Sequence, residues 1–450
     1  MPDIRRARPG DGLIALSHPP VLGTPSRSKL LESILVFILL ALLGMRLEIN
    51  QALTLGDVAA LALSPVWLFH LRFYRWAGSL MALGATALLL GFWLCGFSAA
   101  DHDFDRISYF NNSVVFGGLF LSIGTILWAR TLMPQWLVGV AFGAGLALGV
   151  SGTGRAAENL WKFGYAIPST IVVLSLVGYA DSKWGLNRRL ADLGLLLAVA
   201  LLSGASDGRS LFGLLMLAFV LVLWQLIPQG RTARRAVAKT MLAFAGMVLV
   251  IYNVGTSLLL DGYLGAEAQH RSAEQISLSG SLLLGGRPEM AATAALFQSH
   301  PWGFGVGIRP SLDDILIAKT GMAAIHYEPN NGYVEHYMFG THFELHSVLG
   351  DFWVLFGLAG MAFALLVLVL MTKWIVASVA RRRASGLVIF LCILTLWNIP
   401  FSPMYTSVPT MALAVGLVLS RKTDDSGWRP LPEEKSSPAV LTPSSHTYIK

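Results

Sequence analysis

The chain has 450 residues, of which 54% are hydrophobic and only 13% are charged, and its mean hydropathy is +0.61. These values exclude an ordinary soluble domain and indicate an integral membrane protein. The net charge of +7 does not point to nucleic acid, because the basic residues stand in short clusters between apolar runs, the usual orientation signal of a multispanning protein.

Apolar runs of membrane-spanning length recur along most of the chain, and helices satisfy every backbone polar group within such a run. The sequence therefore predicts an all-α, polytopic membrane protein. We expect about twelve spans, at residues 31–48, 52–70, 77–98, 113–130, 135–151, 165–180, 190–205, 209–227, 238–259, 347–373, 385–401 and 406–420.

Lysine and arginine fall on one side of this arrangement. With the N-terminus inside, the basic segments 70–75, 183–189, 231–239 and 373–383 and the turn at Arg130 are cytoplasmic. The acidic stretch 101–105 and the longest polar interval lie opposite. The predicted organisation is a cytoplasmic tail (1–29), spans 1–9 (30–260), a large periplasmic loop (261–346), spans 10–12 (347–420) and a disordered cytoplasmic tail (421–450) rich in Pro, Ser and charge.

The seventh and eighth spans are joined only by a tight turn, residues 203–210, which places Arg209 at the outer membrane boundary beside Asp207. An arginine at that depth is costly unless it snorkels, pairs or faces a polar cavity, so Arg209 is a candidate functional residue. The alternative is a local ion pair with Asp207, or an anchor at the interface.

A second arginine, Arg287, follows two glycines and precedes Pro288, Glu289 and the apolar stretch 290–297. We expect a short helix here that ends at His300, because the following proline and glycines favour turns. The alternative is an amphipathic helix resting on the bilayer with Arg287 among lipid headgroups. The glycine run after Pro301 is no dinucleotide fingerprint, since it follows no strand and opens no helix.

His346 ends the long polar interval, and Ser347 opens the next span. A helix N-terminus disfavours the charged imidazolium, which leaves a neutral ring able to accept a proton near pH 7. A general base needs that property. The alternative is a histidine that only makes hydrogen bonds at the membrane interface.

The remaining polar and aromatic residues of the loop suit a hydroxyl-rich ligand, by hydrogen bonding or by stacking. His342, Glu344 and His346 suggest zinc, but their order is not His-Glu-x-x-His and no third ligand is defined. We therefore expect no metal and no other cofactor. The candidate substrate-binding residues are Asp207, Trp302, Tyr327, Glu328, Tyr337 and Glu344.

Three motifs in chain order resemble the O-antigen ligase and polysaccharide polymerase family. They are the Gly/Ser turn with Arg209, Gly286-Arg287 ahead of a short helix that ends in Pro301-x-Gly303-x-Gly305-x-Gly307, and His346-Ser347 followed after nine residues by Gly357-x-x-Gly360. The resemblance covers residues 200–370 and, by topology alone, the first six spans. Two features depart from it: Asp207 and Gly208 separate Ser206 from Arg209, and the His/Tyr/Asn-rich stretch 325–343 does not align.

The resemblance implies a C-type helical glycosyltransferase in the bacterial inner membrane, with a metal-independent active site on the periplasmic side. The donor would be a glycan linked to undecaprenyl diphosphate, and the acceptor a second glycan or lipid A core. By position, Arg209 and Arg287 would bind the diphosphate and His346 would deprotonate the acceptor hydroxyl. Expected partners are membrane lipids and a chain-length regulator or other polysaccharide-assembly proteins.

Within the family the same residues serve a polymerase, which extends a lipid-linked chain, or an O-antigen ligase, which transfers the glycan to lipid A core. We favour a polymerase, because the polar, aromatic loop suits a sugar chain. A polysaccharide-lipid transporter or flippase is the alternative from another class. It would place ionisable groups in mid-span or show matching halves with interrupted helices, whereas the candidates here gather at the outer edge.

Overall fold

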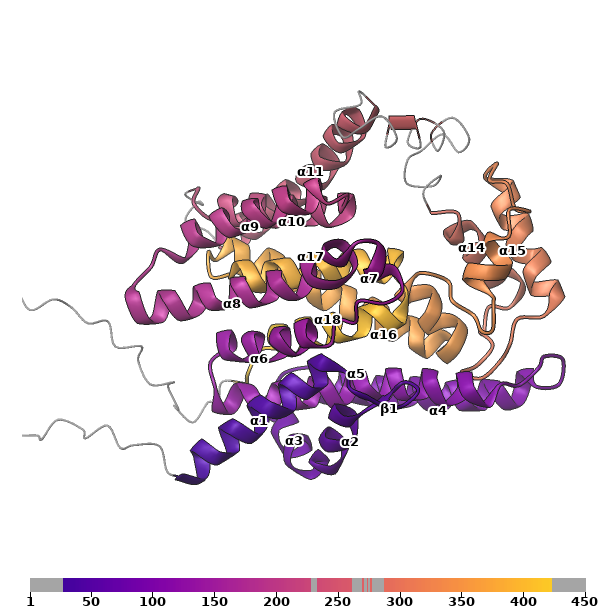
Figure 1. Ribbon diagram of the computed structural model, residues 1–450, viewed down its shortest axis with the longest axis horizontal. Helices are drawn as coiled ribbons and strands as arrows, with labels where there is room; N and C mark the ends of the chain where they lie inside the picture. Colours follow the sequence, from indigo (N-terminus) through magenta and orange to yellow (C-terminus); the bar gives the residue numbers. More distant parts are fainter. Residues whose placement is uncertain are drawn as a thin grey trace, which may run out of the picture.

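The computed structural model describes residues 27–227, 233–260 and 287–422, with residues 269, 270, 273 and 276 between them. The described chain is almost entirely helical (Figure 1), which confirms the all-α prediction. Five of its helices are long and apolar enough to cross a membrane: Arg27–Met45, Ala77–Ser98, Arg106–Leu132, Trp161–Trp184 and Val348–Ala380. Five shorter apolar helices accompany them within the described residues, as expected of a membrane protein.

The described elements, in chain order, are α1 (Arg27–Met45), β1 (Glu48–Asn50), β2 (Leu53–Thr54), α2 (Leu55–Ala62), α3 (Ser64–Leu71), α4 (Ala77–Ser98), α5 (Arg106–Leu132), α6 (Gln135–Leu148), α7 (Arg155–Glu158), the π-helix η1 (Trp161–Tyr165), α8 (Ala166–Trp184), α9 (Arg188–Ala205), α10 (Arg209–Trp224), α11 (Ala233–Leu260), α14 (Glu289–Ser299), α15 (Leu312–Ala324), the π-helix η2 (Val334–Met338), α16 (Val348–Ala380), α17 (Gly386–Phe401) and α18 (Met404–Val418).

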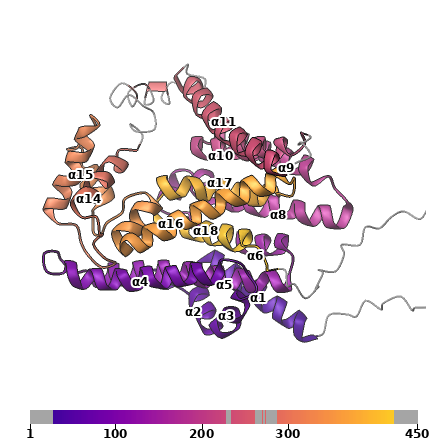
Figure 2. The same ribbon diagram turned by 180° about the vertical axis from the view of Figure 1, so that it is seen from behind.

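Most helices lie side by side along the long axis of the molecule, so that their connections gather at two ends (Figures 1 and 2). The end that carries α14 and α15 is called the loop end, and the end that carries the start of α1 and the end of α18 is called the terminal end. At the terminal end, Trp128 Nε1 of α5 donates to Glu32 Oε1 of α1 (3.0 Å). The Arg130 Nη1 group of α5 donates to the Leu419 carbonyl just after α18 (2.8 Å).

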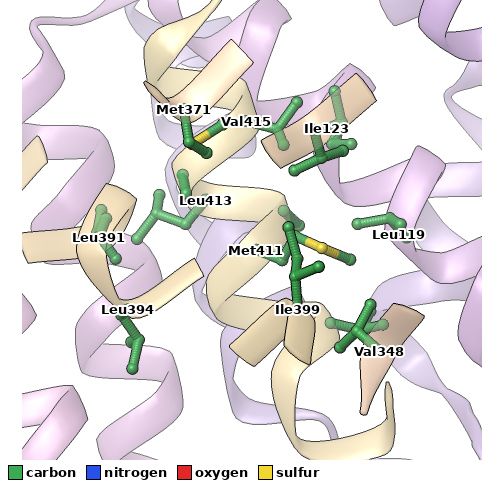
Figure 3. Close-up of a cluster of buried hydrophobic side chains, with 14 of the residues drawn as sticks. Leu119, Ile123, Val348, Met371, Leu391, Leu394, Ile399, Met411, Leu413 and Val415 are labelled. Atoms are coloured by element: carbon green, nitrogen blue, oxygen red, sulfur yellow. The ribbon is translucent and has the colours of Figure 1, made fainter. Parts of the chain in front are cut away.

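The helix α18 lies at the centre of the bundle. Figure 3 shows its Met411, Leu413 and Val415 side chains surrounded by apolar side chains of α5, α16 and α17. All three are almost completely buried. Because lipid is as apolar as these side chains, close packing, more than removal from water, holds such a core together.

Residues 52–70 do not form the single continuous span that the sequence predicts. A reciprocal capping box between Thr54 and Asp57 starts α2, which ends after eight residues. Pro65 then occupies the first turn of α3, where its missing N–H is tolerated but cannot continue the preceding helix. An eight-residue helix is about 12 Å long, well short of a bilayer core, so the prediction is wrong for this segment.

The same segment nevertheless crosses the bundle in two steps. Before it, Arg46 Nη1 donates to the carbonyl of Tyr405 at the loop end of α18 (3.1 Å). After it, the Tyr74 hydroxyl donates to the Leu127 carbonyl of α5 (2.9 Å), and the Arg75 N–H donates to Ser420 beyond α18 (2.9 Å). The chain therefore passes from the loop end to the terminal end through α2 and α3 together.

A kink in α16 receives the glycine-rich segment that follows α14. Gly357 has φ 63° and ψ −156°, a conformation open essentially to glycine alone. Just before this kink, the Val354 carbonyl accepts the N–H groups of Phe304 (2.8 Å) and Gly305 (3.0 Å). At Gly305 (φ 114°), a Cβ would lie 2.5 Å from the backbone nitrogen of Cys95 in α4. Gly305 and Gly357, which belong to two separate motifs, thus both allow the loop backbone to pack closely against the bundle.

The acidic stretch between α4 and α5 ties the loop down at a second place. The Arg309 Nη2 group lies 2.9 Å from Asp105 Oδ1, and His102 contacts Asp101 Oδ1 through Nδ1 (2.7 Å) and Asp314 Oδ2 through Nε2 (3.0 Å). Burial lowers the pKa of His102, but the two carboxylates outweigh it and the net pKa shift is upward. Asp105 and His102 therefore hold the segment before α15 and α15 itself, through Arg309 and Asp314.

Candidate functional site

His346 lies immediately before the capped start of α16, so its predicted place at a helix N-terminus is confirmed. The Ser347 hydroxyl accepts the Gly350 N–H (3.2 Å) and donates to the Ile399 carbonyl of α17 (3.0 Å). The backbone of His346 is left-handed, with φ 53°. Its Nδ1 atom lies 3.2 Å from the carbonyl of Glu344, and its side chain is 15% exposed. The imidazole thus contacts the Glu344 carbonyl just before the capped helix start and keeps access to solvent.

Arg287 lies just before α14, and the predicted short helix is confirmed: α14 ends at Ser299, with His300 as its C-cap. The Arg287 Nη1 group is 3.3 Å from Oε1 of Glu289, which is only 3% exposed. The other carboxylate oxygen of Glu289 is buried without a hydrogen-bond partner. The guanidinium also lies 5.8 Å from the ring centre of Phe401, the last residue of α17. Arg287 and His346 therefore both border the loop end of α17.

Tyr333 connects these two residues. Its ring centre lies 6.3 Å from that of His346. Burial raises the pKa of the Tyr333 phenol above its ordinary value. The negative charge of Glu289 also raises the pKa of Tyr333, whereas the positive charge of Arg287 lowers it. Both charges therefore lie within electrostatic reach of the phenol. Tyr333 therefore stays protonated near neutral pH and can donate a hydrogen bond to an oxygen bound between the arginine and the histidine.

Two further tyrosines and a second histidine border this group. The ring of Tyr333 lies 5.6 Å from Tyr337 and 6.3 Å from Tyr327. Glu344 stands between the two histidines, with its carboxylate oxygens 3.9 Å from His346 Nε2 and 3.8 Å from His342 Nε2. Burial lowers the pKa of His342, which favours its neutral form. The predicted residues Tyr327, Tyr337 and Glu344 thus lie around Tyr333 and His346.

Arg209 opens α10, as predicted, but its contacts are local. Its Nε atom is 3.7 Å from Asp207 Oδ1, and Asp207 also holds Lys162 Nζ at 2.9 Å. Among the described residues no hydrogen bond or ion pair joins Arg209 to Arg287 or His346. The local ion pair with Asp207, the alternative given for Arg209, is therefore present in the structure.

The segment that carries α7 links the turn of Arg209 with the group around Tyr333. The Asn159 Nδ2 group donates to the carbonyl of Ser206 (2.9 Å), one residue before Asp207. At the other end of this segment, the positive charge of Arg155 lowers the pKa of the Tyr333 phenol, as that of Arg287 does. Sequence inspection missed Arg155, although Ser151-Gly152-Thr153-Gly154-Arg155 repeats the pattern of a Gly/Ser turn with an arginine between two apolar runs.

Two other predicted binding residues lie elsewhere. Trp302 is exposed and lines an apolar groove of about 360 Å³ between α4 and the kink of α16, together with Trp93, Phe97 and Leu358. Glu328 is exposed, and its Oε1 atom accepts the N–H of Asn330 (3.0 Å). The described contacts therefore join neither residue to the group around His346.

Asn112 is a buried polar residue that was not predicted as a site residue. It donates to the carbonyl of Val306 (2.7 Å) and accepts the hydroxyl of Tyr405 (2.7 Å). The ring of Tyr405 lies 6.0 Å from that of His342. Asn112 therefore connects α5, the glycine-rich segment and α18 beneath the loop. In the sequence Asn112 stands between Asn111 and Ser113, just before the predicted span 113–130, so it resembles part of a polar connection.

Within the described part of the chain, no three His, Cys, Asp or Glu side chains converge in an arrangement that could hold a metal ion. Comparison of the chain with protein-family models, with curated proteins and with solved structures finds no match in any of the three. The function of the chain is therefore inferred from its own residues.

Proposed function

We propose that the chain is a membrane glycosyltransferase of the O-antigen ligase and polysaccharide polymerase type. It would transfer a glycan from undecaprenyl diphosphate to an acceptor hydroxyl at the periplasmic face of the bacterial inner membrane. The observation that carries the proposal is the grouping of Arg287, Tyr333 and His346 at the loop end of α17, because this group combines an anion-binding cation, a neutral donor and a proton acceptor. The order of the three sequence motifs supports the same assignment.

Arg287 is assigned to the diphosphate of the donor. A guanidinium forks onto phosphate oxygens and stabilises the charge that develops as the lipid diphosphate departs. Buried Glu289 holds the guanidinium from one side, which restricts the orientations open to a long side chain. Arg209 is assigned to the same diphosphate on the resemblance alone, since its described contacts are with its own turn.

His346 is assigned as general base. The acceptor oxygen would attack the anomeric carbon of the donor sugar as the bond from that carbon to the diphosphate oxygen breaks. The diphosphate would leave with the bonding electron pair, and the acceptor proton would pass to the imidazole. Tyr333, kept protonated, would donate to a sugar or phosphate oxygen between them. Each step needs only groups of this chain and its two substrates.

The acceptor is proposed to be a second lipid-linked glycan, which makes the enzyme a polymerase. The rings of Tyr327, Tyr333 and Tyr337 follow one another next to His346, and such aromatic faces suit the apolar faces of sugar rings. A ligase would use the same donor residues with lipid A core as acceptor. The surface glycan of a deletion strain separates these functions.

In that strain a polymerase defect leaves a single repeat unit attached, whereas a ligase defect leaves full-length lipid-linked chains and a bare core. We expect the single repeat unit. Repeat units trapped on the cytoplasmic leaflet would instead indicate a flippase and contradict the enzyme proposal.

The proposed topology has about twelve crossings, both termini in the cytoplasm and the loop of residues 261–346 in the periplasm. Thr320 is an exposed residue of α15, and Lys183 is exposed at the terminal end of α8. A cysteine at position 320 should react with an impermeant thiol reagent added to the periplasm, and a cysteine at 183 should not. The reverse pattern would overturn the orientation.

A further inference from the structure

Two turns at the terminal end of the bundle bring five arginines together. Arg188 and Arg189 open α9, and the run Arg381-Arg382-Arg383 joins α16 to α17. The turns are in direct contact, because Arg189 Nη2 donates to the carbonyl of Arg382 (2.8 Å). Helices α9 and α17 are also joined, because Asp192 Oδ2 accepts the N–H of Gly386 (2.8 Å). The five positive charges therefore belong to one patch, called the arginine patch below.

The arginine patch has little negative charge of its own within the described residues. The ion pair found there is Arg188 Nε to Asp192 Oδ2, at 4.0 Å, and the same oxygen already accepts the Gly386 N–H. The Nε atoms of Arg188 and Arg382 are buried and lack a hydrogen-bond partner. Buried donors without partners are uncommon and costly. The Arg382 Nη2 group already donates to the Ile227 carbonyl, and a surface ligand cannot reach the two buried Nε atoms. An anion bound to the remaining accessible Nη groups would offset the mutual repulsion of the five arginines.

Exposed apolar side chains stand beside the arginine patch. Trp184, Leu186 and Leu190, on either side of Arg188, are 70%, 46% and 58% exposed. Trp at a helix end and long cationic side chains next to apolar ones are typical of the membrane interface. A soluble phosphate compound would gain nothing from these three side chains, whereas the acyl chains of a lipid would cover them.

We propose that the arginine patch binds the phosphate headgroup of an acidic phospholipid, with Arg188, Arg189 and Arg382 on the phosphate and the acyl chains against Trp184, Leu186 and Leu190. Basic pockets between membrane helices are known to take such headgroups. The site lies at the terminal end of the bundle, away from the group around His346, and does not depend on the proposed enzymatic activity.

Another basic turn at the same end supplies a matched control. Arg72 and Arg75 are exposed between α3 and α4, and the Arg72 guanidinium lies 3.5 Å from the ring centre of Phe69. Both side chains are exposed, whereas Arg188 and Arg382 are partly buried. Loss of these two arginines removes the same charge from the same end of the protein without touching the arginine patch.

The test is native mass spectrometry of the full-length protein in detergent, titrated with phosphatidylglycerol or with phosphatidylcholine. We expect Arg188→Gln/Arg382→Gln to raise the apparent Kd for phosphatidylglycerol about tenfold or more, and Arg72→Gln/Arg75→Gln to change it by less than about threefold. Phosphatidylcholine should bind weakly to all three proteins. Equal loss in the two double variants would overturn the proposal in favour of general surface charge.

A charge-reversal variant and a competition experiment test the lipid assignment further. Arg381 and Arg383 are exposed, so Arg381→Glu/Arg383→Glu should fold normally and still weaken phosphatidylglycerol binding if the patch is the site. Inorganic phosphate should compete only weakly, because it lacks acyl chains. Complete displacement of the lipid by millimolar phosphate would assign the patch to a soluble phosphate ligand and overturn the lipid assignment.

Discussion

Arg287 and Arg209 share a sequence setting, since each follows a glycine-containing turn and stands at the start of a helix, but the structure gives them different surroundings. The carboxylate partner of Arg287 is Glu289, which is 3% exposed, and the guanidinium lies beside Phe401 at the end of a buried helix. The partner of Arg209 is Asp207, which is 53% exposed and also binds Lys162.

The burial of the partner carboxylate decides how well each arginine is oriented. An exposed ion pair such as that of Arg209 contributes about 0.2–1 kcal/mol and is screened by salt. A carboxylate shielded from water holds its partner in a narrower range of orientations, and an anion bound there is screened less. The comparison therefore predicts that the group around Arg287 carries most of the function and that the turn of Arg209 adjusts it.

The largest effect should come from His346. If the imidazole accepts the acceptor proton, His346→Ala should lower turnover about a hundredfold to ten-thousandfold. Donor binding should change little, because the diphosphate is proposed to bind the arginines and not the imidazole. His346→Gln, which keeps a hydrogen-bonding group but cannot take the proton, should be almost as poor. Transfer would be measured in proteoliposomes with purified lipid-linked glycan, and folding would be compared by thermal shift.

Two outcomes would contradict this assignment. Normal turnover of His346→Gln would mean that the imidazole only positions a substrate. Loss of wild-type transfer in EDTA would contradict the metal-independent mechanism and direct attention back to His342, Glu344 and His346.

The second effect concerns the shape of the cation at position 287. Arg287→Lys keeps the positive charge but loses the planar fork that matches phosphate geometry, so we expect turnover to fall about a hundredfold. The matched control is Arg309→Lys, at an arginine paired with Asp105 outside the group. Near wild-type turnover of Arg287→Lys would reduce Arg287 to a surface anchor.

Local patterns in the sequence were sufficient to predict several features of this group. A short helix after Arg287 follows from an apolar stretch closed by His300-Pro301, and the place of His346 follows from the abrupt start of an apolar run at Ser347. Such signals depend on neighbours in the chain. They predict a helix boundary without needing any knowledge of the packing.

Features that arise from contacts between distant segments could not be predicted in the same way. Just before the kink at Gly357, the Val354 carbonyl accepts the N–H groups of Phe304 and Gly305, which lie some 50 residues away in the sequence. The effect of the Arg155 charge on the pKa of Tyr333 likewise depends on how two distant segments fold together. The division of residues 52–70 had a visible signal in Pro65, but mean hydropathy over the segment concealed it.

A substitution of Arg209 tests the contrast between the two arginines, and its effect on transfer should be smaller than that of Arg287→Lys. Because the described contacts of Arg209 are with its own exposed turn, Arg209→Gln should raise the KM for the donor roughly tenfold and alter kcat by less than about threefold. Steady-state transfer assays at several donor concentrations would separate the two constants. A loss of kcat as large as that of Arg287→Lys would show that both arginines stabilise the transition state, and the contrast drawn from their partners would fail.

Asp207→Asn should have the smallest effect on transfer, and its sign separates two roles of the carboxylate. The Asp207 backbone is left-handed (φ 57°), a conformation that asparagine tolerates, so Asp207→Asn should preserve the turn and cost less than about 1 kcal/mol of stability. If Asp207 competes with the donor diphosphate for Arg209, removal of its charge should lower the donor KM about twofold to fivefold, with kcat unchanged. If Asp207 instead contacts the substrate directly, as the sequence suggests, the same substitution should raise the KM. The double variant Asp207→Asn/Arg209→Gln separates these cases, because a competing carboxylate has little effect on binding once the arginine is gone, whereas a direct substrate contact is lost in either background.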